Sequence, residues 1–440
     1  MDVTAEALES ALAQIVPHAR PASAGDAVLG IQPRVVVEPE DERQVADILR
    51  YANGAGLAVI PRGSGSQLAV GNPPRRADII LSMTRLNQLV EHAPHDLTVS
   101  AQAGMWLADL QRILGAAGQW LALDPLLDSA ATLGGLISTN ASGARRLRYG
   151  GVRDQIIGVR VALADGTIAR GGGKVVKNVA GYDLPKLYTG ALGALGVIIS
   201  ANFRLYPLPA FSATARLDAA ALPALGSVVR RILAQPLTPA ALDIFSPAAP
   251  GAPYTLAARF ESGVREAVET QTRTVSAAPI AEGAQPRDIL SGEDDARFWR
   301  DADALWREPL SGPAADDAAR TAQATIKASL PLSAVAGWLA ALEAVCVDDA
   351  MTASWRAHVG HGIVFAQMRA APETLAERIA SLRRDASERR GSLVITDLPP
   401  TLVGAIDPWG PVAALKLMQS LKQRFDPNDI LNPGRFVGGI

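Results

Sequence analysis

The chain has 440 residues, with 42 lysines and arginines against 44 aspartates and glutamates, so its formal net charge is −2. This near-balance argues against a nucleic-acid-binding surface, which is usually strongly basic. No uninterrupted apolar run approaches the ~18 residues of a membrane-spanning helix. A chain of this length exceeds what one hydrophobic core sustains, so two domains are expected.

Two further features bear on location and redox chemistry. The acidic N-terminus Met1–Glu6 lacks the basic and then apolar pattern of an export signal, so we expect a cytoplasmic protein. Cys346 is the one cysteine, and a single thiolate cannot hold an iron–sulfur cluster. Any such cluster that takes electrons from this chain therefore belongs to another polypeptide. Cys346 itself lies in an apolar run and is interpreted as a small buried side chain.

The predicted elements begin with an amphipathic helix at residues 4–16, where apolar and polar residues alternate at helical spacing. Residues 35–39 and 57–60 are strand-like and residues 42–55 between them are helical, which predicts a βαβ unit. The next predicted elements are strands at residues 78–82, 97–101 and 157–163 and a helix at residues 105–117 that ends at Gly118.

A boundary is expected at Leu205–Pro209, because its two prolines interrupt regular hydrogen bonding. Beyond it the pattern indicates an α+β domain that ends in an amphipathic helix. Its predicted helices are residues 222–233, 264–277, 333–345 and 411–425, and its predicted strands include residues 255–260 and 362–366. The sequence thus predicts an α+β fold with a helical segment at residues 1–25, a first domain at residues 26–208 and an α+β cap at residues 209–440.

Three glycine-bearing stretches stand out in the first domain. They are Pro61-Arg62-Gly63-Ser64-Gly65-Ser66-Gln67, Thr132-Leu133-Gly134-Gly135 with Asn140 and Gly143 following, and Gly190 to Val197. The first follows a predicted strand, so its free main-chain N–H groups are placed to form an anion-holding concavity. Three such stretches in one domain favour a single long ligand with phosphate in its middle.

Two common glycine-rich motifs do not fit. A dinucleotide fingerprint needs a third glycine where the first stretch has Leu68. A Walker loop needs Ser or Thr after Gly-Lys, and Gly173-Lys174 is followed by Val175. Neither a nicotinamide dinucleotide nor ATP is therefore expected as the principal cofactor.

The same stretches resemble the PCMH-type FAD-binding domain of the vanillyl-alcohol oxidase family. More narrowly, the run from Gly173 to Leu184, which contains Val179-Ala180-Gly181-Tyr182-Asp183, is similar to the glycolate oxidase FAD-binding subunits, the E subunits. The resemblance covers residues 26–208 well and returns at Asp426–Arg435. It implies a two-part FAD-binding domain followed by the cap, whose tail lies on the flavin side.

The resemblance also implies which residues bind FAD. They are Pro61, Arg62, Gly63, Ser64, Gly65, Ser66, Gln67, Leu68, Pro125, Thr132, Leu133, Gly134, Gly135, Ser138, Thr139, Asn140, Gly143, Gly196, Val197 and Ile198. The first stretch would hold the pyrophosphate through main-chain N–H groups, and the others would line the ribityl and flavin side. Ser66 stands where several relatives carry a histidine bonded to the flavin, so FAD is expected to be non-covalent.

The catalytic positions depart from those of relatives. A His-Val-Gly-x-Gly-Asn-x-His pattern is represented here by His358-Val359-Gly360-His361-Gly362-Ile363-Val364-Phe365, which lacks the asparagine and the last histidine. The relatives' later Glu-His pair has no counterpart either. His358 and His361 are the remaining candidates for catalysis, and no metal is expected because their spacing alone does not make a metal site.

These features together predict an FAD-binding subunit of a multi-subunit glycolate oxidase or (R)-2-hydroxyacid dehydrogenase. Its expected partners are a sister flavoprotein, an iron–sulfur subunit and a small 2-hydroxyacid, without nucleic acid, and with any contact to the inner membrane face made through those partners. Two alternatives stay open: an autonomous FAD-dependent oxidoreductase, and a non-catalytic assembly subunit.

Overall fold

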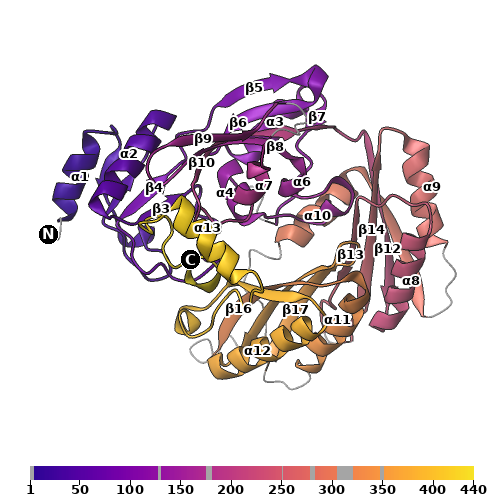
Figure 1. Ribbon diagram of the computed structural model, residues 1–440. Helices are drawn as coiled ribbons and strands as arrows, with labels where there is room; N and C mark the ends of the chain where they lie inside the picture. The colour runs from indigo at the N-terminus through magenta and orange to yellow at the C-terminus, as the bar shows by residue number, and fades with distance from the viewer. Residues whose placement is uncertain are drawn as a thin grey trace. The chain divides into compact units, whose positions relative to one another are not determined.

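The computed structural model describes residues 4–126, 130–174, 181–249, 251–277, 283–304, 321–346 and 351–440. The chain divides into two compact units. Unit 1 comprises Met1–Ala141, Gly151–Pro207 and Pro411–Ile440, and unit 2 comprises Ser142–Gly150 and Leu208–Gly410. Figure 1 labels their elements, which mix helices and sheets and confirm the expected α+β class. Among the residues just given, no helix is both long and apolar enough to cross a bilayer.

The first sheet of unit 1 is built around a parallel core. Strand β1 (Ala19–Pro21) pairs antiparallel with β2 (Val35–Val37), and β4 (Ile79–Ser82) lies parallel to both β2 and β3 (Val59–Arg62). Helix α2 (Glu42–Ala55) connects β2 to β3, so the predicted βαβ unit is present, with β4 inserted between its strands. The apolar residues of β2, β3 and β4 are buried, as is typical of parallel strands covered on both faces. Helix α1 (Ala5–Ala13) also packs on this core.

The second sheet of unit 1 is antiparallel, in the order β5-β6-β10-β8-β9. Its core contains leucines and isoleucines of the sheet and of the helices that pack against it. A two-stranded sheet lies beside it. The strands are β5 (Leu89–Ala93), β6 (Thr98–Gln102), β7 (Gln119–Trp120), β8 (Ile156–Ala162), β9 (Ile168–Gly172), β10 (Val197–Arg204) and β11 (Tyr206–Pro207), and the helices are α3 (Leu107–Gly115), α4 (Leu133–Thr139), α6 (Val152–Gln155) and α7 (Leu184–Tyr188).

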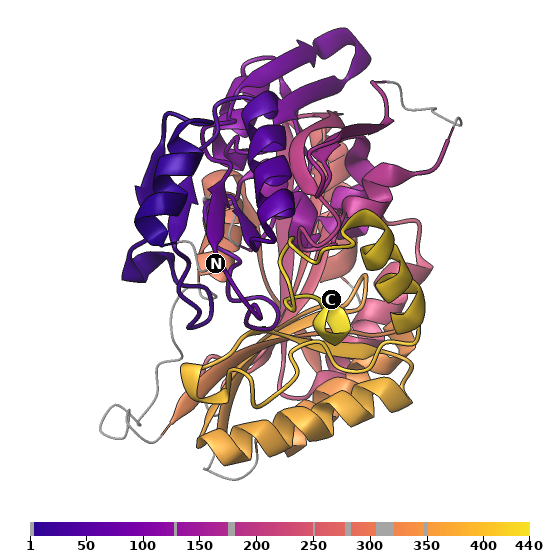
Figure 2. The ribbon, with the colours of Figure 1, turned by 60° about the vertical axis from the view of Figure 1, so that its left-hand side comes forward.

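Unit 2 is an eight-stranded antiparallel sheet in the order β15-β12-β14-β13-β17-β18-β16-β19. Four helices pack one face through a large apolar core, and Figures 1 and 2 show α12 running along that face. The strands are β12 (Phe211–Ala219), β13 (Ala241–Phe245), β14 (Tyr254–Ser262), β15 (Ala284–Ser291), β16 (Ala322–Ser329), β17 (Met351–His358), β18 (Ile363–Ala370) and β19 (Ser392–Asp397), and the four helices are α8 (Leu222–Ala234), α9 (Arg265–Ser276), α11 (Val335–Ala344) and α12 (Pro372–Glu388).

The other face of the unit 2 sheet is polar. Strand alternation places Ile326 in the core and Lys327 on the opposite face, where Lys327 lies beside Phe365 of β18. Helix α10 (Gly292–Ala304) contributes to this face through a small cluster that joins its Trp299 to Ala144, a residue just before the short helix α5 (Arg146–Tyr149).

After unit 2 the chain returns to unit 1. Helix α13 (Leu415–Phe425) begins four residues later than the sequence indicated, and Ile430 and Leu431 beyond it join the core of the first sheet. Leu431 forms a parallel bridge with Val59 of β3. The tail therefore lies against the strand that leads into the first glycine stretch.

Candidate functional site

A cavity in unit 1 brings the three glycine stretches together. It encloses about 870 Å³ of space, part of which is open to solvent. The C-terminal tail completes its wall. The lining residues are Pro61, Arg62, Gly63, Ser64, Gly65, Ser66, Gln67, Leu68, Met83, Ala103, Pro125, Ala131, Thr132, Gly134, Gly135, Leu136, Ser138, Thr139, Ala141, Leu192, Gly193, Val197, Ile198, Asn432 and Arg435.

The first stretch leaves β3 as a loop with free donors. Among the described residues, the main-chain N–H groups of Ser64, Gly65 and Gln67 have no hydrogen-bond acceptor. Gly65 has φ +89°, a left-handed conformation that glycine adopts without strain. The Ser64 hydroxyl donates to the carbonyl of Ala130 at 2.5 Å, which ties this loop to the second stretch. The loop thus presents unused N–H donors on the cavity wall.

The second stretch forms the start of α4 and packs closely on its surroundings. Thr132 caps the helix by accepting from the N–H of Gly135 at 3.4 Å. A Cβ on Gly63 would lie 2.1 Å from Thr132 Oγ1, and a Cβ on Gly134 would lie 2.9 Å from Ala103 Cβ. Glycine at these positions therefore lets the loop, helix and sheet approach one another around the cavity.

The third stretch meets the tail. Asn432 Nδ2 donates to the carbonyl of Leu192 at 2.5 Å, while Asn432 Oδ1 is buried with no hydrogen-bond donor among the described residues. The Arg435 guanidinium donates through Nη2 to the carbonyls of Leu68 and Val70, both at 2.7 Å. Burial lowers the pKa of Arg435 to about 10. Asn432 thus offers the cavity an acceptor, and Arg435 adds a buried cation to its wall.

Arg62 contributes a cation that is already paired. Its Nη1 lies 2.9 Å from Asp26 Oδ1, and Arg20 contacts the same carboxylate at 2.8 Å. The hydrogen bond from Arg20, with others from Ser23 and Arg62, holds the pKa of Asp26 well below its usual range despite the opposing effect of burial. The Arg62 side chain is therefore fixed at the cavity by Asp26.

Most of the residues that the sequence singled out for FAD line this cavity, and four do not. Leu133 is fully buried in the core, and Asn140 ends α4 with φ +50°. Gly196 packs against Val161, and Gly143 belongs to unit 2. Nine lining residues are not among the FAD-binding residues expected from the sequence: Met83, Ala103, Ala131, Leu136, Ala141, Leu192, Gly193, Asn432 and Arg435. Of these, Leu192 and Gly193 belong to the third glycine stretch. Asn432 and Arg435 belong to the tail that the resemblance implies on the flavin side, although neither was expected as an individual site residue.

The Gly173–Leu184 run is only partly described. Residues 175–180 lie outside the described residues, so the identifying Val179-Ala180 is among those not placed. Gly173 and Lys174 line a second groove of unit 1, on the side of β8 and β9 that carries Arg160 and Arg170.

In unit 2, His358 is held by a buried carboxylate. His358 Nδ1 lies 2.8 Å from Asp243 Oδ1, and Arg356 Nε donates to Asp243 Oδ2 at 2.7 Å. Burial disfavours the Asp243 carboxylate, but the charges of His358 and Arg356 outweigh it and lower its pKa to about 2. His358 Nε2 is buried and has no hydrogen-bond partner among the described residues. An imidazole oriented in this way has its second nitrogen free to accept a proton.

His361 and two cations lie on the same polar face. The rings of His358 and His361 are 5.0 Å apart, and burial followed by the charge of His358 lowers the pKa of His361 to about 3. Lys327 Nζ lies 5.9 Å from the centre of the Phe365 ring, and burial followed by the charge of Arg146 lowers its pKa to about 8. Neither cation forms an ion pair among the described residues. Lys327 and Arg146 therefore form an electropositive pair beside a neutral His361.

Cys346 is half-buried, and burial raises the pKa of its thiol to about 11, which keeps it protonated and unreactive at neutral pH. Across the described ranges, no three His, Cys, Asp or Glu side chains are arranged to hold a metal ion.

Comparisons with known proteins relate both units to flavoproteins. A model of the FAD binding domain matches residues 33–172, and a model of the C-terminal domain of FAD linked oxidases matches residues 210–393 and 409–436. The chain is 28% identical to glycolate oxidase subunit GlcD of Bacillus subtilis, over 92% of this chain and 88% of that protein.

Two further relatives and one solved structure extend the comparison. The chain is 26% identical to the D-2-hydroxyglutarate dehydrogenase of Xanthomonas citri pv. viticola over 92% of this chain and 89% of that protein. It is 37% identical to the D-lactate dehydrogenase of Archaeoglobus fulgidus over 39% of each. A solved alkyldihydroxyacetonephosphate synthase shares the fold, with a TM-score of 0.71 and 17% identity over 92% of this chain and 76% of that one.

Proposed function

The chain belongs to the PCMH-type FAD-linked oxidases, and from this premise we propose that it is the FAD-binding subunit of a multi-subunit glycolate oxidase or related (R)-2-hydroxyacid dehydrogenase. FAD is its cofactor, and the reaction class is oxidation of a CH–OH group. The observation that carries the proposal is the unit 1 cavity, whose wall joins the three glycine stretches to the tail.

The residues of the cavity fit FAD. An anionic pyrophosphate needs several N–H donors, and those of Ser64, Gly65 and Gln67 have no other acceptor among the described residues. A flavin ring system also carries an N–H group, for which the buried Asn432 Oδ1 is a suitable acceptor. FAD, when bound, supplies the two-electron acceptor for alcohol oxidation. We expect it to be held without a covalent bond, because the described cavity wall contains no histidine, cysteine or tyrosine.

Unit 2 supplies groups suited to a 2-hydroxyacid. Lys327 and Arg146 carry positive charge that would attract a carboxylate, and both lack an ion-pair partner among the described residues. His358 would accept the hydroxyl proton at Nε2, while Asp243 keeps its other nitrogen protonated. This arrangement is the observation that favours the second candidate function, an autonomous FAD-dependent 2-hydroxyacid oxidoreductase.

Electron transfer beyond the flavin needs a partner in this proposal. The lone thiol, Cys346, is partly buried and protonated, so an iron–sulfur relay would have to come from a second polypeptide. We place the resulting complex in the cytoplasm, with any contact to the inner membrane face made by the partners.

The test is spectroscopic and uses the purified full chain. We expect the chain to bind added FAD with flavin absorption bands, and acid precipitation to leave the flavin in the supernatant. Glycolate and D-lactate are then added without oxygen, first to the chain alone and then to the chain with its co-purifying partners.

The outcomes separate the candidates. Bleaching of the flavin bands only with partners present supports the subunit, and bleaching of the chain alone supports the autonomous enzyme. Loss of that bleaching in His358→Gln would place the proton acceptor at His358. A chain that refuses FAD even with its partners present contradicts both and leaves the assembly subunit.

A further inference from the structure

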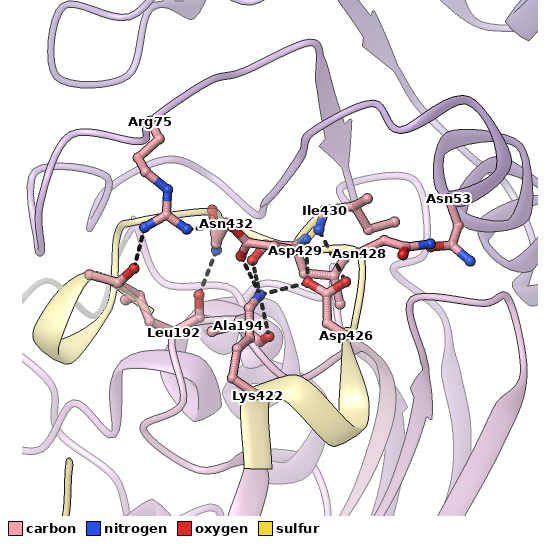
Figure 3. A network of polar contacts seen from close by, with 12 residues as sticks. Asn53, Arg75, Leu192, Ala194, Lys422, Asp426, Asn428, Asp429, Ile430 and Asn432 are labelled. Atoms are coloured by element: carbon pink, nitrogen blue, oxygen red, sulfur yellow. Dashed lines mark hydrogen bonds and ion pairs between the residues drawn. The ribbon is translucent and has the colours of Figure 1, made fainter. Parts of the chain in front are cut away.

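A buried lysine in the tail has no place in the cavity or in the chemistry of the proposed function. Lys422 of α13 is 6% exposed, and its Nζ meets the carbonyl of Ala194 at 3.1 Å, the carbonyl of Leu431 at 2.8 Å and Asp426 Oδ2 at 2.6 Å. Figure 3 shows these bonds converging on the one ammonium group. An ammonium has three donors, and these three acceptors are within hydrogen-bond distance of it. A second, more exposed carboxylate, that of Asp429, lies 3.4 Å from the same Nζ.

Asp426 fixes the turn that follows α13. Its carboxylate is 1% exposed and, besides Lys422, accepts the N–H groups of Ile430 at 3.0 Å and Leu431 at 2.7 Å. Within the same stretch Asp429 has φ +50° and Asn432 has φ +47°. Aspartate and asparagine adopt this left-handed conformation more readily than other non-glycine residues, which suits them to a tight turn. The ion pair and its main-chain bonds hold the turn in place.

The turn delivers the tail to the cavity. Val59 of β3 donates to the carbonyl of Ile430 at 2.7 Å, and Asn432 donates back to the carbonyl of Val59 at 3.0 Å. The Asn432 side chain then donates to the carbonyl of Leu192 in the third stretch, and the Arg435 side chain donates to the carbonyls of Leu68 and Val70, just after the first stretch. Lys422 adds a direct bond to the carbonyl of Ala194, within the third stretch. The ion pair does not line the cavity itself. It is linked through main-chain groups to the two parts of the wall formed near the first and third stretches.

Burying an ion pair costs desolvation free energy, and apolar residues of similar size often stabilise a helix as well. Unlike apolar contacts, the hydrogen bonds of this pair are directional, and each one fixes the position of a particular carbonyl or N–H group. We propose that Lys422 and Asp426 are a positioning pair for the cofactor cavity, which set Asn432 and Arg435 in its wall and so determine how tightly FAD is retained. This inference rests on the proposed binding of FAD in that cavity.

The test compares FAD affinity with folding. The full chain is prepared as Lys422→Met and as Asp426→Asn, with Lys416→Met as the matched control, since Lys416 is an exposed lysine of the same helix. FAD dissociation constants are measured by flavin fluorescence, and visible circular dichroism reports the environment of the bound ring. Melting of the FAD-free protein reports folding.

We expect both variants of the pair to weaken FAD binding at least about tenfold, the effect of about one lost hydrogen bond, and to change the flavin dichroism. Lys416→Met should match the wild type. Asp426→Asn keeps the shape of the side chain, so it provides the test of FAD affinity if Lys422→Met does not fold. The double variant that combines Lys422→Met with Asn432→Ala should bind FAD only slightly more weakly than Asn432→Ala alone, because Lys422 acts partly through Asn432.

Equal FAD affinity in the wild type and in folded Asp426→Asn would overturn the inference while leaving the proposed function intact. Strictly additive losses in the double variant, with unchanged dichroism, would also overturn it and leave Lys422 a purely structural residue. If the wild type itself binds no FAD, the proposed function fails and the inference fails with it.

Discussion

On the polar face of unit 2, two adjacent histidines differ in whether a carboxylate is hydrogen-bonded to the ring. His358 is bonded to the Asp243 carboxylate, whereas both ring nitrogens of His361 are buried without a hydrogen-bond partner among the described residues. Arg146 and His358 oppose a proton on His361, and Asp243 and the Gly143 backbone favour one less strongly than burial opposes it. His361 is therefore neutral in the folded protein at neutral pH, while His358 is held by its hydrogen bond to Asp243.

The pKa of His361 predicts how stability depends on pH. The pKa is about 3 in the folded protein and 6.5 ordinarily, so between these values only the unfolded chain binds the proton. The free energy of unfolding should therefore fall as the pH drops from 6.5 toward 3, and His361 should add no slope above 6.5. We expect the wild type to melt at a lower temperature at pH 5.0 than at pH 7.5, and His361→Gln to reduce that difference.

The exposed His95 provides the control, since His95→Gln should keep the wild-type difference in melting temperature. Asp243 adds little between pH 5.0 and 7.5, because the pKa of its carboxyl, about 2 in the folded protein and 3.8 ordinarily, lies below that range in both states. Equal pH dependence in His361→Gln and the wild type would show that His361 is solvated rather than buried.

Among the elements, the loop after β3 is the most constrained by its neighbours. Gly63 lies so close to Thr132 that a methyl group would displace the cap of α4. Gly54, in α2, has nothing within 4 Å of the position of a Cβ and a helical conformation. Close packing therefore requires glycine at position 63, whereas nothing in the packing requires it at position 54.

Alanine substitution separates the two glycines. Gly63→Ala should destabilise unit 1 by about 1–3 kcal/mol through overpacking and should weaken FAD binding, because the loop must move. Gly54→Ala should instead raise stability by about 0.4–1 kcal/mol, since it restricts the unfolded chain. Thermal melting and FAD titration of both proteins check this, and unchanged FAD affinity in Gly63→Ala would contradict the role assigned to the loop.

Local signals predicted the elements well. Helix α2 begins and ends where expected, because Asp41 caps its start and Gly56 its end, in a left-handed conformation. Strand β3 is displaced to Val59–Arg62, since its pairing with β4 rather than its own hydrophobicity sets its limits. Asn432 and Arg435 are separated from the first stretch by all of unit 2, so only the fold brings them to the cavity. The pairing of His358 with Asp243 was missed for the same reason.

At the scale of the whole molecule, each unit is assembled from separate stretches of chain. The short Ser142–Gly150 stretch joins unit 2 through Glu261, which is 2% exposed. Glu261 accepts from Arg145 at 2.8 Å and from the Tyr149 hydroxyl at 3.0 Å, and its carbonyl accepts from Arg148. One carboxylate thus anchors a stretch that is remote in sequence from the rest of unit 2.

Removing that anchor should affect unit 2 selectively. Glu261→Ala leaves Arg145 without its buried carboxylate and Arg259 with Asp295 alone, and should destabilise unit 2 by about 3–5 kcal/mol. Glu377→Ala, an exposed glutamate of α12, should cost little. Hydrogen exchange should show lost protection in residues 142–150 and in β14, while unit 1 keeps its FAD affinity. An equal loss of protection from hydrogen exchange in both units would contradict a selective effect on unit 2.

The return of the chain to unit 1 at Pro411 has a consequence for biosynthesis. Residues 61–68 and 131–139 leave the ribosome long before residues 426–435, and all of Leu208–Gly410 is translated in between. A nascent chain halted within unit 2 would present its glycine loops without Asn432 or Arg435 to close the wall. We therefore expect a product terminated before residue 426 to bind no FAD and to be colourless, and loading with the flavin to follow translation of the tail.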